Sequence, residues 1–210
     1  MGKKNLTNKQ RRTNKKNPRE LHSYMRSEST LETNETFLIV CEGKKTEPLY
    51  FDAFKVLTAT VRCIGTGFNT VSLVNETIRL KSEKDYDQVW CVFDKDSFSN
   101  DNFNTAITIA RNNEIEVAYS NEAFELWYLL HFSYVQTAIS RHQYAGILNQ
   151  YLPEPYDKVN KNMYSLLLKD QDTAIKNAKR LLEHQNLNNP ATCNPITFVF
   201  ELVEELNKHR

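Results

Sequence analysis

The stretch FLIVCEGKKTEP, residues 37–48, decides the fold that this sequence predicts. Its first five residues are apolar or nearly so, a pattern typical of a strand that helices cover on both faces of a parallel sheet. The run stops at Glu42-Gly43, which places a carboxylate on a tight turn at the carboxyl end of a buried strand. Ligands bind at this edge in open α/β sheets, so Glu42 is the first candidate functional residue.

A second stretch of the chain has the same design. The apolar run VWCVF, residues 89–93, stops at Asp94-Lys95-Asp96. In an extended chain, side chains two residues apart point the same way, so Asp94 and Asp96 can face one ion while Lys95 points elsewhere. Together with Glu42, the two runs deliver three carboxylates to what we expect to be one edge of the sheet.

Short strands and helices alternate along the first part of the chain, which favours a parallel sheet with right-handed crossovers. We expect strands at 37–41, 60–64, 88–93 and 115–119. Beyond residue 133 we expect helices only, at 143–152, 164–168, 173–185 and 195–207. The prediction is therefore an α/β fold: a mainly parallel four-stranded sheet flanked by helices over residues 35–132, with a helical C-terminal extension over 133–210 packed on it.

The net charge of +1 hides an asymmetry between the two ends of the chain. Residues 1–26 hold nine Lys or Arg and one Glu, and the remaining 184 residues hold 18 Lys or Arg and 25 acids. Residues 1–34 contain too few apolar side chains to offset their ordering entropy, so we expect a disordered basic arm. The arm is either a phosphate-contacting segment for nucleic acid or a solubilising tail, and the sequence favours neither.

Composition excludes several classes of protein. No apolar run approaches the roughly 20 residues that a membrane span needs, and no secretory signal is visible. Neither a P-loop nor a dinucleotide-binding glycine pattern occurs. The four cysteines are widely spaced, without a CxxC pair or zinc-ligand spacing, so we expect buried reduced thiols in a cytoplasmic protein.

The three carboxylates suit a magnesium site. Mg²⁺ takes oxygen ligands, usually one or two protein carboxylates completed by waters and substrate phosphates. Glu42 is then a further ligand or a general base, and Glu47 can reach the same edge from the start of the next helix. Lys44 and Lys45 can meet a scissile phosphate. The alternative is structural: acids after strands often cap loops and helices, and the two lysines can belong to a solvated loop.

Three blocks of the chain resemble the RloB-like family, which is associated with restriction-modification loci and phage defence in bacteria. They read VCEGKKTEPLYF, VWCVFDKDSF and SNEAFELWYLLHF, and NPAT near the C-terminus is similar to a further block. Glu-Gly after the first strand and DxD after the third also resemble the TOPRIM fold of topoisomerases, primases and OLD-type nucleases. The resemblance covers roughly residues 37–205 and excludes the basic arm.

The resemblance implies roles for particular residues. Glu42 would be the TOPRIM glutamate, Asp94 and Asp96 its metal-holding aspartates, and Glu47 the second acid found just downstream in OLD-like enzymes. It implies Mg²⁺-dependent phosphodiester cleavage, with Mn²⁺ as a substitute, acting on DNA or RNA such as tRNA. It also suggests an ABC-type or AAA-type ATPase as partner.

Further candidates lie on or before the helix expected at 123–132. The resemblance draws attention to Asn121, Glu125 and His131, near a helix start that faces the edge with the acids. We expect Trp127 to pack in the core, and we favour a satisfied, partly buried histidine for His131. Downstream, aromatic residues alternate with cations, which suits single-stranded nucleic acid but is more typical of an ordinary helix entrance: Tyr156, Lys158, Lys161 and Tyr164.

We therefore predict a metal-dependent nuclease of bacterial phage defence. One rival is a non-catalytic subunit that binds metal or nucleic acid and regulates a partner. A second rival is a receiver-like phosphoacceptor domain, which shares acids after the first strand and an Asp after the third. A receiver also needs a fifth strand that ends in Lys, and the sequence does not predict one.

Overall fold

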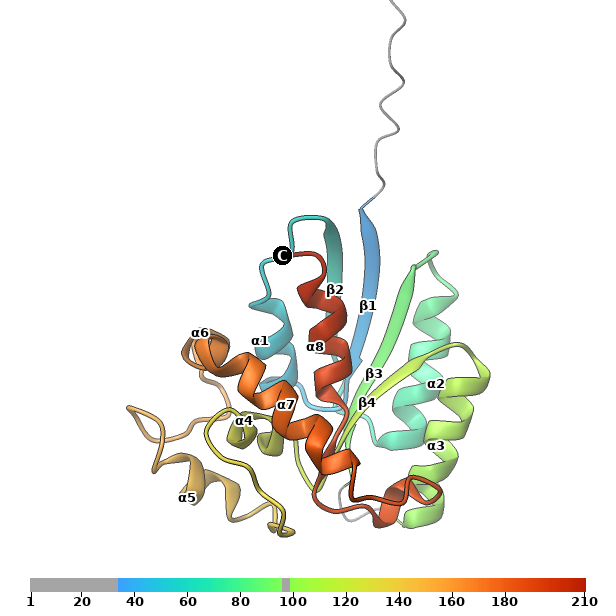
Figure 1. The fold of residues 1–210 in the computed structure, drawn as a ribbon. Coiled ribbons are helices and arrows are strands. Elements are labelled where there is room, and N and C mark those ends of the chain that lie inside the picture. Colours follow the sequence, from blue (N-terminus) through green and yellow to red (C-terminus); the bar gives the residue numbers. More distant parts are fainter. Residues whose placement is uncertain (1–33, 96–98) are drawn as a thin grey trace, which may run out of the picture. The chain divides into compact units, whose positions relative to one another are not determined.

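The computed structural model describes residues 34–95 and 99–210. Within these residues, one sheet holds strands in the order β2-β1-β3-β4-β5 (Figure 1). The first four strands are parallel, and β5 pairs antiparallel with β4. The bounds of the strands are β1 Glu35–Cys41, β2 Ala59–Gly65, β3 Gln88–Asp94, β4 Glu116–Asn121 and β5 Ile196–Thr197.

The two apolar runs form the centre of this sheet. Residues 37–41 of β1 are completely buried, and residues 89–93 of β3 are nearly so. Helices cover both faces, with α2 and α3 against one face and α8 against the other (Figure 1). The prediction of a mainly parallel α/β sheet flanked by helices is confirmed.

The prediction of four strands is wrong, because residues 196–197 add a fifth. This segment was expected to begin a helix, but it pairs with the end of β4 through Ser120 and Thr197, whose hydroxyls lie 2.9 Å apart. Two residues are too few to show the alternating pattern of a strand. The helix α8 starts only after this pairing, at Val199.

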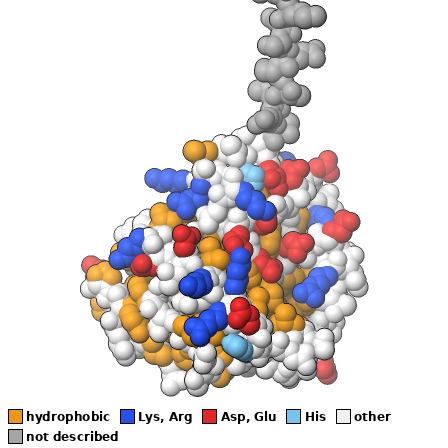
Figure 2. All heavy atoms as spheres, viewed as in Figure 1, with side chains coloured by type: hydrophobic (Ala, Val, Ile, Leu, Met, Phe, Trp, Pro, Cys, Tyr) orange, Lys and Arg blue, Asp and Glu red, His pale blue; other side chains and the backbone are white. Residues whose placement is uncertain are grey.

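The helices follow the predicted order, and those expected at 123–132, 143–152, 173–185 and 195–207 are shorter than predicted. In the first half they are α1 Thr46–Asp52, α2 Thr70–Lys81, α3 Asn100–Asn112 and α4 Glu125–Leu130. In the second half they are α5 Tyr144–Leu148, α6 Met163–Leu167, α7 Gln171–Leu182 and α8 Val199–Asn207, with short 3-10 helices at Leu168–Asp170 and Pro190–Thr192. Charged side chains of both signs cover the face that carries α7 and α8 (Figure 2).

Helix α2 shows how local sequence sets these bounds. The Asn69 side chain accepts a hydrogen bond from the Ser72 amide at 3.4 Å, which caps the first turn. Buried residues then recur every three or four positions, so one face of the helix packs on the sheet. They are Leu73, Val74, Thr77 and Leu80.

An aromatic cluster joins α1, α4 and α6 beneath the carboxyl edge of the sheet. The Tyr50 ring packs against the rings of Phe124 and Tyr164 at 5.8 Å and 5.5 Å between centroids. Trp127 is fully buried, as predicted for a packing residue. This cluster fixes the starts of α1 and α4 relative to each other, and both helix starts carry acids discussed below.

Residues 34–210 belong to one compact unit, in which the C-terminal residues pack against the start of β1 and the residues before β2. The His209 carbonyl accepts hydrogen bonds from the Leu57 and Thr58 amides at 2.6 Å and 3.3 Å. The His209 ring lies 3.1 Å from Glu35. The predicted division at residue 132 stays a prediction, and the basic arm lies outside the described residues except for Asn34.

Two further predictions can be compared with the described residues. All four cysteines are free, and Cys41, Cys91 and Cys193 are buried. Residues 34–95 and 99–210 contain no helix that is long and apolar enough to cross a membrane.

Candidate active site at the carboxyl edge of the sheet

Glu42 and Asp94 lie side by side because their strands are neighbours in the sheet. The Glu42 amide extends the ladder by donating to the Val92 carbonyl at 2.8 Å. The Asp94 amide donates to Glu42 Oε2 at 3.2 Å. The parallel pairing of β1 with β3 therefore places both acids at one point of the edge.

Glu47 comes from the first turn of α1 and folds back over Gly43. A Cβ atom at Gly43 would overlap the Glu47 carboxylate, so a side chain at this position would displace the acid. Glu47 is buried although it carries a carboxylate. The tight turn that ends β1 thus brings a second acid back to the edge within five residues.

Glu125 is the fourth acid and comes from the first turn of α4. It is buried, and its Oε1 atom accepts a hydrogen bond from the Tyr156 hydroxyl at 2.9 Å. Lys158 Nζ lies 3.5 Å from the same oxygen. The prediction that Tyr156 and Lys158 form an ordinary helix entrance is wrong, because both lie in the irregular segment between α5 and α6 and reach this acid.

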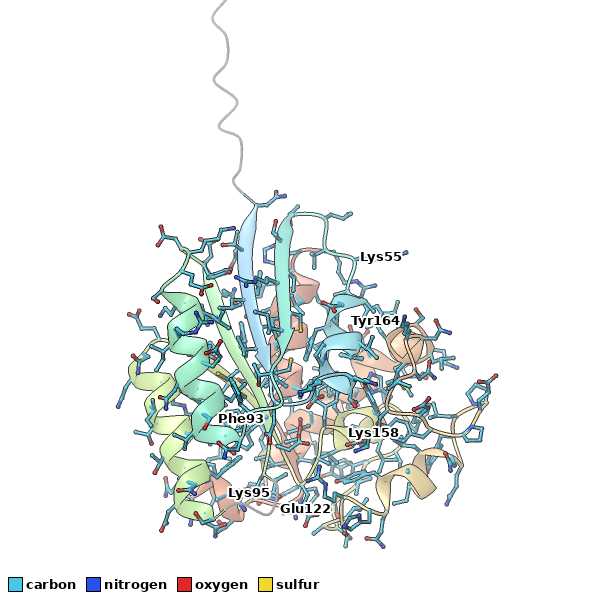
Figure 3. The ribbon with its side chains drawn as sticks, turned by 180° about the vertical axis from the view of Figure 1, so that it is seen from behind. Lys55, Phe93, Lys95, Glu122, Lys158 and Tyr164 are labelled. Carbon is cyan, nitrogen blue, oxygen red and sulfur yellow. The ribbon has the colours of Figure 1, made fainter. Side chains whose placement is uncertain are left out.

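These side chains enclose one cavity of about 320 Å³. Figure 3 shows where its surroundings come from: Lys95 and Glu122 lie at the lower edge, where β3 and β4 end, and Lys158 approaches from the helical side. Four acids and four cations line the cavity together with Gly43, Thr46 and Phe124. The charged residues are Glu42, Glu47, Asp94, Glu125, Lys44, Lys45, Arg141 and Lys158.

The acids repel one another inside this cavity. Burial raises the pKa of Asp94 well above its usual range, and the charges of Glu47, Glu125 and Glu42 raise it further. A hydrogen bond with the Phe124 backbone opposes this shift. The pKa of Glu47 is also raised, first by burial and then by Glu125. A cation entering the cavity would relieve this repulsion.

The donor set fits a hard divalent cation. Its charged ligand atoms are carboxylate oxygens, which Mg²⁺ prefers, and neither histidine nor cysteine lines the cavity. Within residues 34–95 and 99–210, no three acidic, histidine or cysteine side chains already converge as a metal-binding group. Mg²⁺ needs only one or two protein carboxylates when waters and phosphates complete its shell. Asp96 lies outside the described residues, so its metal-binding role stays a prediction.

Two predicted candidates lie away from the cavity. Asn121 is buried, and its side-chain amide donates to the carbonyls of Cys193 at 2.7 Å and Ala191 at 3.4 Å. It therefore holds the NPAT segment against the end of β4. His131 is buried in the core, where Nδ1 lies 2.9 Å from the Trp127 carbonyl and burial lowers its pKa to about 4. Neither side chain lines the cavity, and both contact backbone carbonyls of the protein interior.

Sequence reasoning missed Arg141 as a residue of this cavity. Its amide donates to Glu122 Oε2 at 2.9 Å, which anchors the segment after α4 near the edge. No motif or periodicity marks it, because an irregular segment carries it there. Lys158 has a sequence signal, the alternation of aromatic and cationic residues from Tyr156 to Tyr164.

Fold and site together define an α/β protein with a carboxylate-lined cavity at the carboxyl edge of a mostly parallel sheet. A family model described as RloB-like protein matches residues 37–206. The match covers most of the chain, which therefore belongs to the RloB-like family. No curated protein and no solved structure matches the chain significantly.

Proposed function

We propose that this chain is a Mg²⁺-dependent nuclease of the TOPRIM type that cleaves phosphodiester bonds in DNA or RNA. One observation carries the proposal: four acids from two strand ends and two helix starts line a single cavity whose rim is cationic. A nuclease needs this combination, because the acids hold metal while cations bind the phosphates on either side.

The proposed roles follow from the residues that line the cavity. Glu42 and Asp94 are the proposed metal ligands, with Glu47 as a further ligand. Asp96, which lies outside the described residues, is proposed as a ligand from the family resemblance alone. A bound Mg²⁺ ion, or Mn²⁺ in its place, supplies positive charge to the phosphoryl oxygens of the reacting bond. Glu42 acts as ligand or as general base for the attacking water.

The cationic residues bind the substrate in this proposal. Lys44 and Lys45 follow the Glu42-Gly43 turn and line the cavity, so they contact the scissile phosphate as point charges. Lys158 lies close to Glu125 and is mostly exposed, which leaves it available to a neighbouring phosphate. From the family resemblance, we also propose that the protein acts in phage defence together with an ABC-type or AAA-type ATPase. We propose the cytoplasm as its location.

A non-catalytic binding subunit is the second candidate. The acids and cations that line the cavity can bind a metal ion and a phosphate without catalysing cleavage. A receiver-like phosphoacceptor fits less well. The fifth strand is antiparallel, spans Ile196–Thr197 and is followed by Phe198, where a receiver has a parallel strand ending in Lys.

A cleavage assay separates these candidates. Wild type, Asp94→Asn and the control Glu204→Gln would be given labelled tRNA, single-stranded DNA and plasmid with Mg²⁺, Mn²⁺ or EDTA. Each protein would be run alone and with an ATPase encoded beside it. We expect metal-dependent cutting by wild type and Glu204→Gln, and a loss of at least about 100-fold in Asp94→Asn. Metal binding without cutting under any condition would instead support the binding subunit.

A further inference from the structure

The loop between β2 and α2 lies directly beside the candidate active site. The loop reads Gly-Thr-Gly-Phe-Asn, residues 65–69. It starts at the last residue of β2, and Thr70, the first residue of α2, follows it. The Thr66 amide donates to the Cys41 carbonyl at 3.0 Å, and the Gly67 amide donates to the Glu42 carbonyl at 2.8 Å. These two hydrogen bonds therefore fix the loop beside Glu42, the acid that follows β1.

Two glycines let the loop contact the β1–α1 turn closely. A Cβ atom at Gly65 would lie 2.5 Å from the Gly43 carbonyl oxygen. Gly67 has a φ of 70°, and a Cβ atom there would overlap the side chain of Lys44. Lys44 thus lies across Gly67 while it also lines the acidic cavity, so one cation connects the two places.

The loop presents an aromatic ring to solvent. Phe68 is 46% exposed, whereas most aromatic side chains of the described residues lie in the core. Its amide is held by the Thr66 hydroxyl at 3.1 Å. An exposed aromatic ring on a fixed loop can stack on a nucleobase, and stacking is open only to a base that is not paired within a duplex.

A small cavity of about 230 Å³ continues the loop toward the starts of α2 and α3. It is lined by Asn69, Thr70, Val71 and Asn102. The first amides of a helix lack intrahelical acceptors and attract phosphate. Helix α2, with 12 residues, is long enough to present such a site at its start. Thr70 supplies an independent sign of a missing ligand: it is 1% exposed, and its hydroxyl has no hydrogen-bond partner within residues 34–95 and 99–210.

We propose that the β2–α2 loop binds the substrate as a single strand of nucleic acid, which rests on the nuclease function proposed above. Phe68 stacks on an unpaired base, while Lys44 and the Thr70 end of α2 contact phosphates beside the scissile bond. A duplex cannot offer a base to Phe68, so the site selects single strands or unpaired ends. The shared chemistry is a phosphodiester strand with free bases, in DNA or in RNA.

Binding tests this proposal without requiring cleavage. The full chain with Asp94→Asn would be the parent, and fluorescence anisotropy would give the Kd for labelled single-stranded DNA, single-stranded RNA and duplex at one fixed salt concentration. We expect Phe68→Ala to weaken single-strand binding by about 5- to 100-fold and to leave duplex binding unchanged. Phe68→Trp should restore binding, because it keeps the stacking surface.

Two further variants control for loss of fold and for general hydrophobicity. Leu57→Ala removes an apolar side chain that is 76% exposed and precedes the opposite end of β2, and it should bind like the parent. Thr70→Val keeps the shape of the residue and should weaken binding several-fold without lowering the melting temperature. Lys44→Ala should reduce the slope of log K against log salt by about 1.

The outcomes separate this inference from the nuclease proposal. The single-strand inference is overturned if Phe68→Ala binds single strands within about twofold of the parent. It is also overturned if the affinities for single strands and for duplex fall together. If wild type cleaves nucleic acid while Phe68→Ala binds normally, the nuclease stands and the loop has no such role. If Phe68 is needed for binding but wild type cleaves nothing with metal, the loop binds single strands and the nuclease proposal fails.

Discussion

Among the described residues, two of the acid-lined hollows differ in how their charges are balanced. The first is the cavity at the carboxyl edge of the sheet. The second is a groove of about 300 Å³ beside α8, where Figure 2 shows acidic side chains gathered. The groove is lined by Gln88, Trp90, Glu116, Glu201, Glu204 and Glu205.

Lysines beside the groove neutralise part of its negative charge. Lys179 pairs with Glu204 at 2.6 Å, and Lys208 pairs with Glu205 at 2.6 Å. The hydrogen bond from Lys208 lowers the pKa of Glu205, whereas the pKa of Asp94 in the cavity is raised. Glu201 is an exception, because burial raises its pKa. The number of acids therefore does not identify a site. The distinguishing features are burial and mutual repulsion, which keep the pKa of Asp94 raised although Lys158 pairs with Glu125.

The largest expected difference between the two hollows is in metal binding. Saturating Mg²⁺ or Mn²⁺ should stabilise wild type by about 2.7 kcal/mol when the metal is at 100 times its Kd. Thermal melts with and without EDTA would measure this. Glu42→Gln should abolish the stabilisation, and Glu204→Gln in the groove should retain it. Equal loss in both variants would contradict the assignment of the metal to the cavity.

A smaller effect, on the free energy of unfolding, is expected when an acid of the cavity loses its hydrogen-bond partner. Tyr156→Phe removes the hydroxyl that donates to buried Glu125, so the free energy of unfolding should fall by about 1 to 2 kcal/mol in urea titrations. The Glu125 carboxylate is buried, so the loss of this hydrogen bond leaves the acid with less compensation for its burial. An unchanged midpoint would show that Glu125 is more open to water than its burial indicates.

Removal of a cavity acid should stabilise the metal-free protein. The raised pKa of Asp94 means that the folded state holds a proton more tightly than the unfolded state, so stability falls as pH rises above the ordinary carboxyl range. At pH 7 in EDTA, Asp94→Asn should raise the free energy of unfolding by about 1 kcal/mol. Urea titrations at pH 5 and pH 7 should show a weaker pH dependence in the variant. An identical dependence would remove the argument from repulsion.

The smallest effect is expected in the groove. The Lys179–Glu204 pair is 51% and 37% exposed on its two side chains, so solvent weakens the attraction. Lys179→Met keeps an apolar stem over the Phe200 ring and should lower the free energy of unfolding by no more than about 0.5 kcal/mol. A loss as large as that of Tyr156→Phe would erase the contrast between the hollows.

The sequence predicted those parts of the site that depend on local pattern. Apolar runs end at Glu42 and Asp94, and adjacent parallel strands had to bring the two acids together. Local pattern does not place Arg141 and Lys158 in the cavity, because irregular segments carry them there through tertiary packing. The fifth strand was missed for a related reason: two residues pair with a strand whose sequence lies about 75 positions earlier.

The pairing of β5 with β4, and of His209 with the start of β2, also has a consequence for folding kinetics. Thr197 joins Ser120 across 77 positions, and His209 joins Thr58 across 151. Such closures come late, because the chain loses loop entropy before these contacts repay it. Until they form, the edge of β4 is open to strands of other chains. The yield of refolding should therefore fall as protein concentration rises, even where the folded protein is stable.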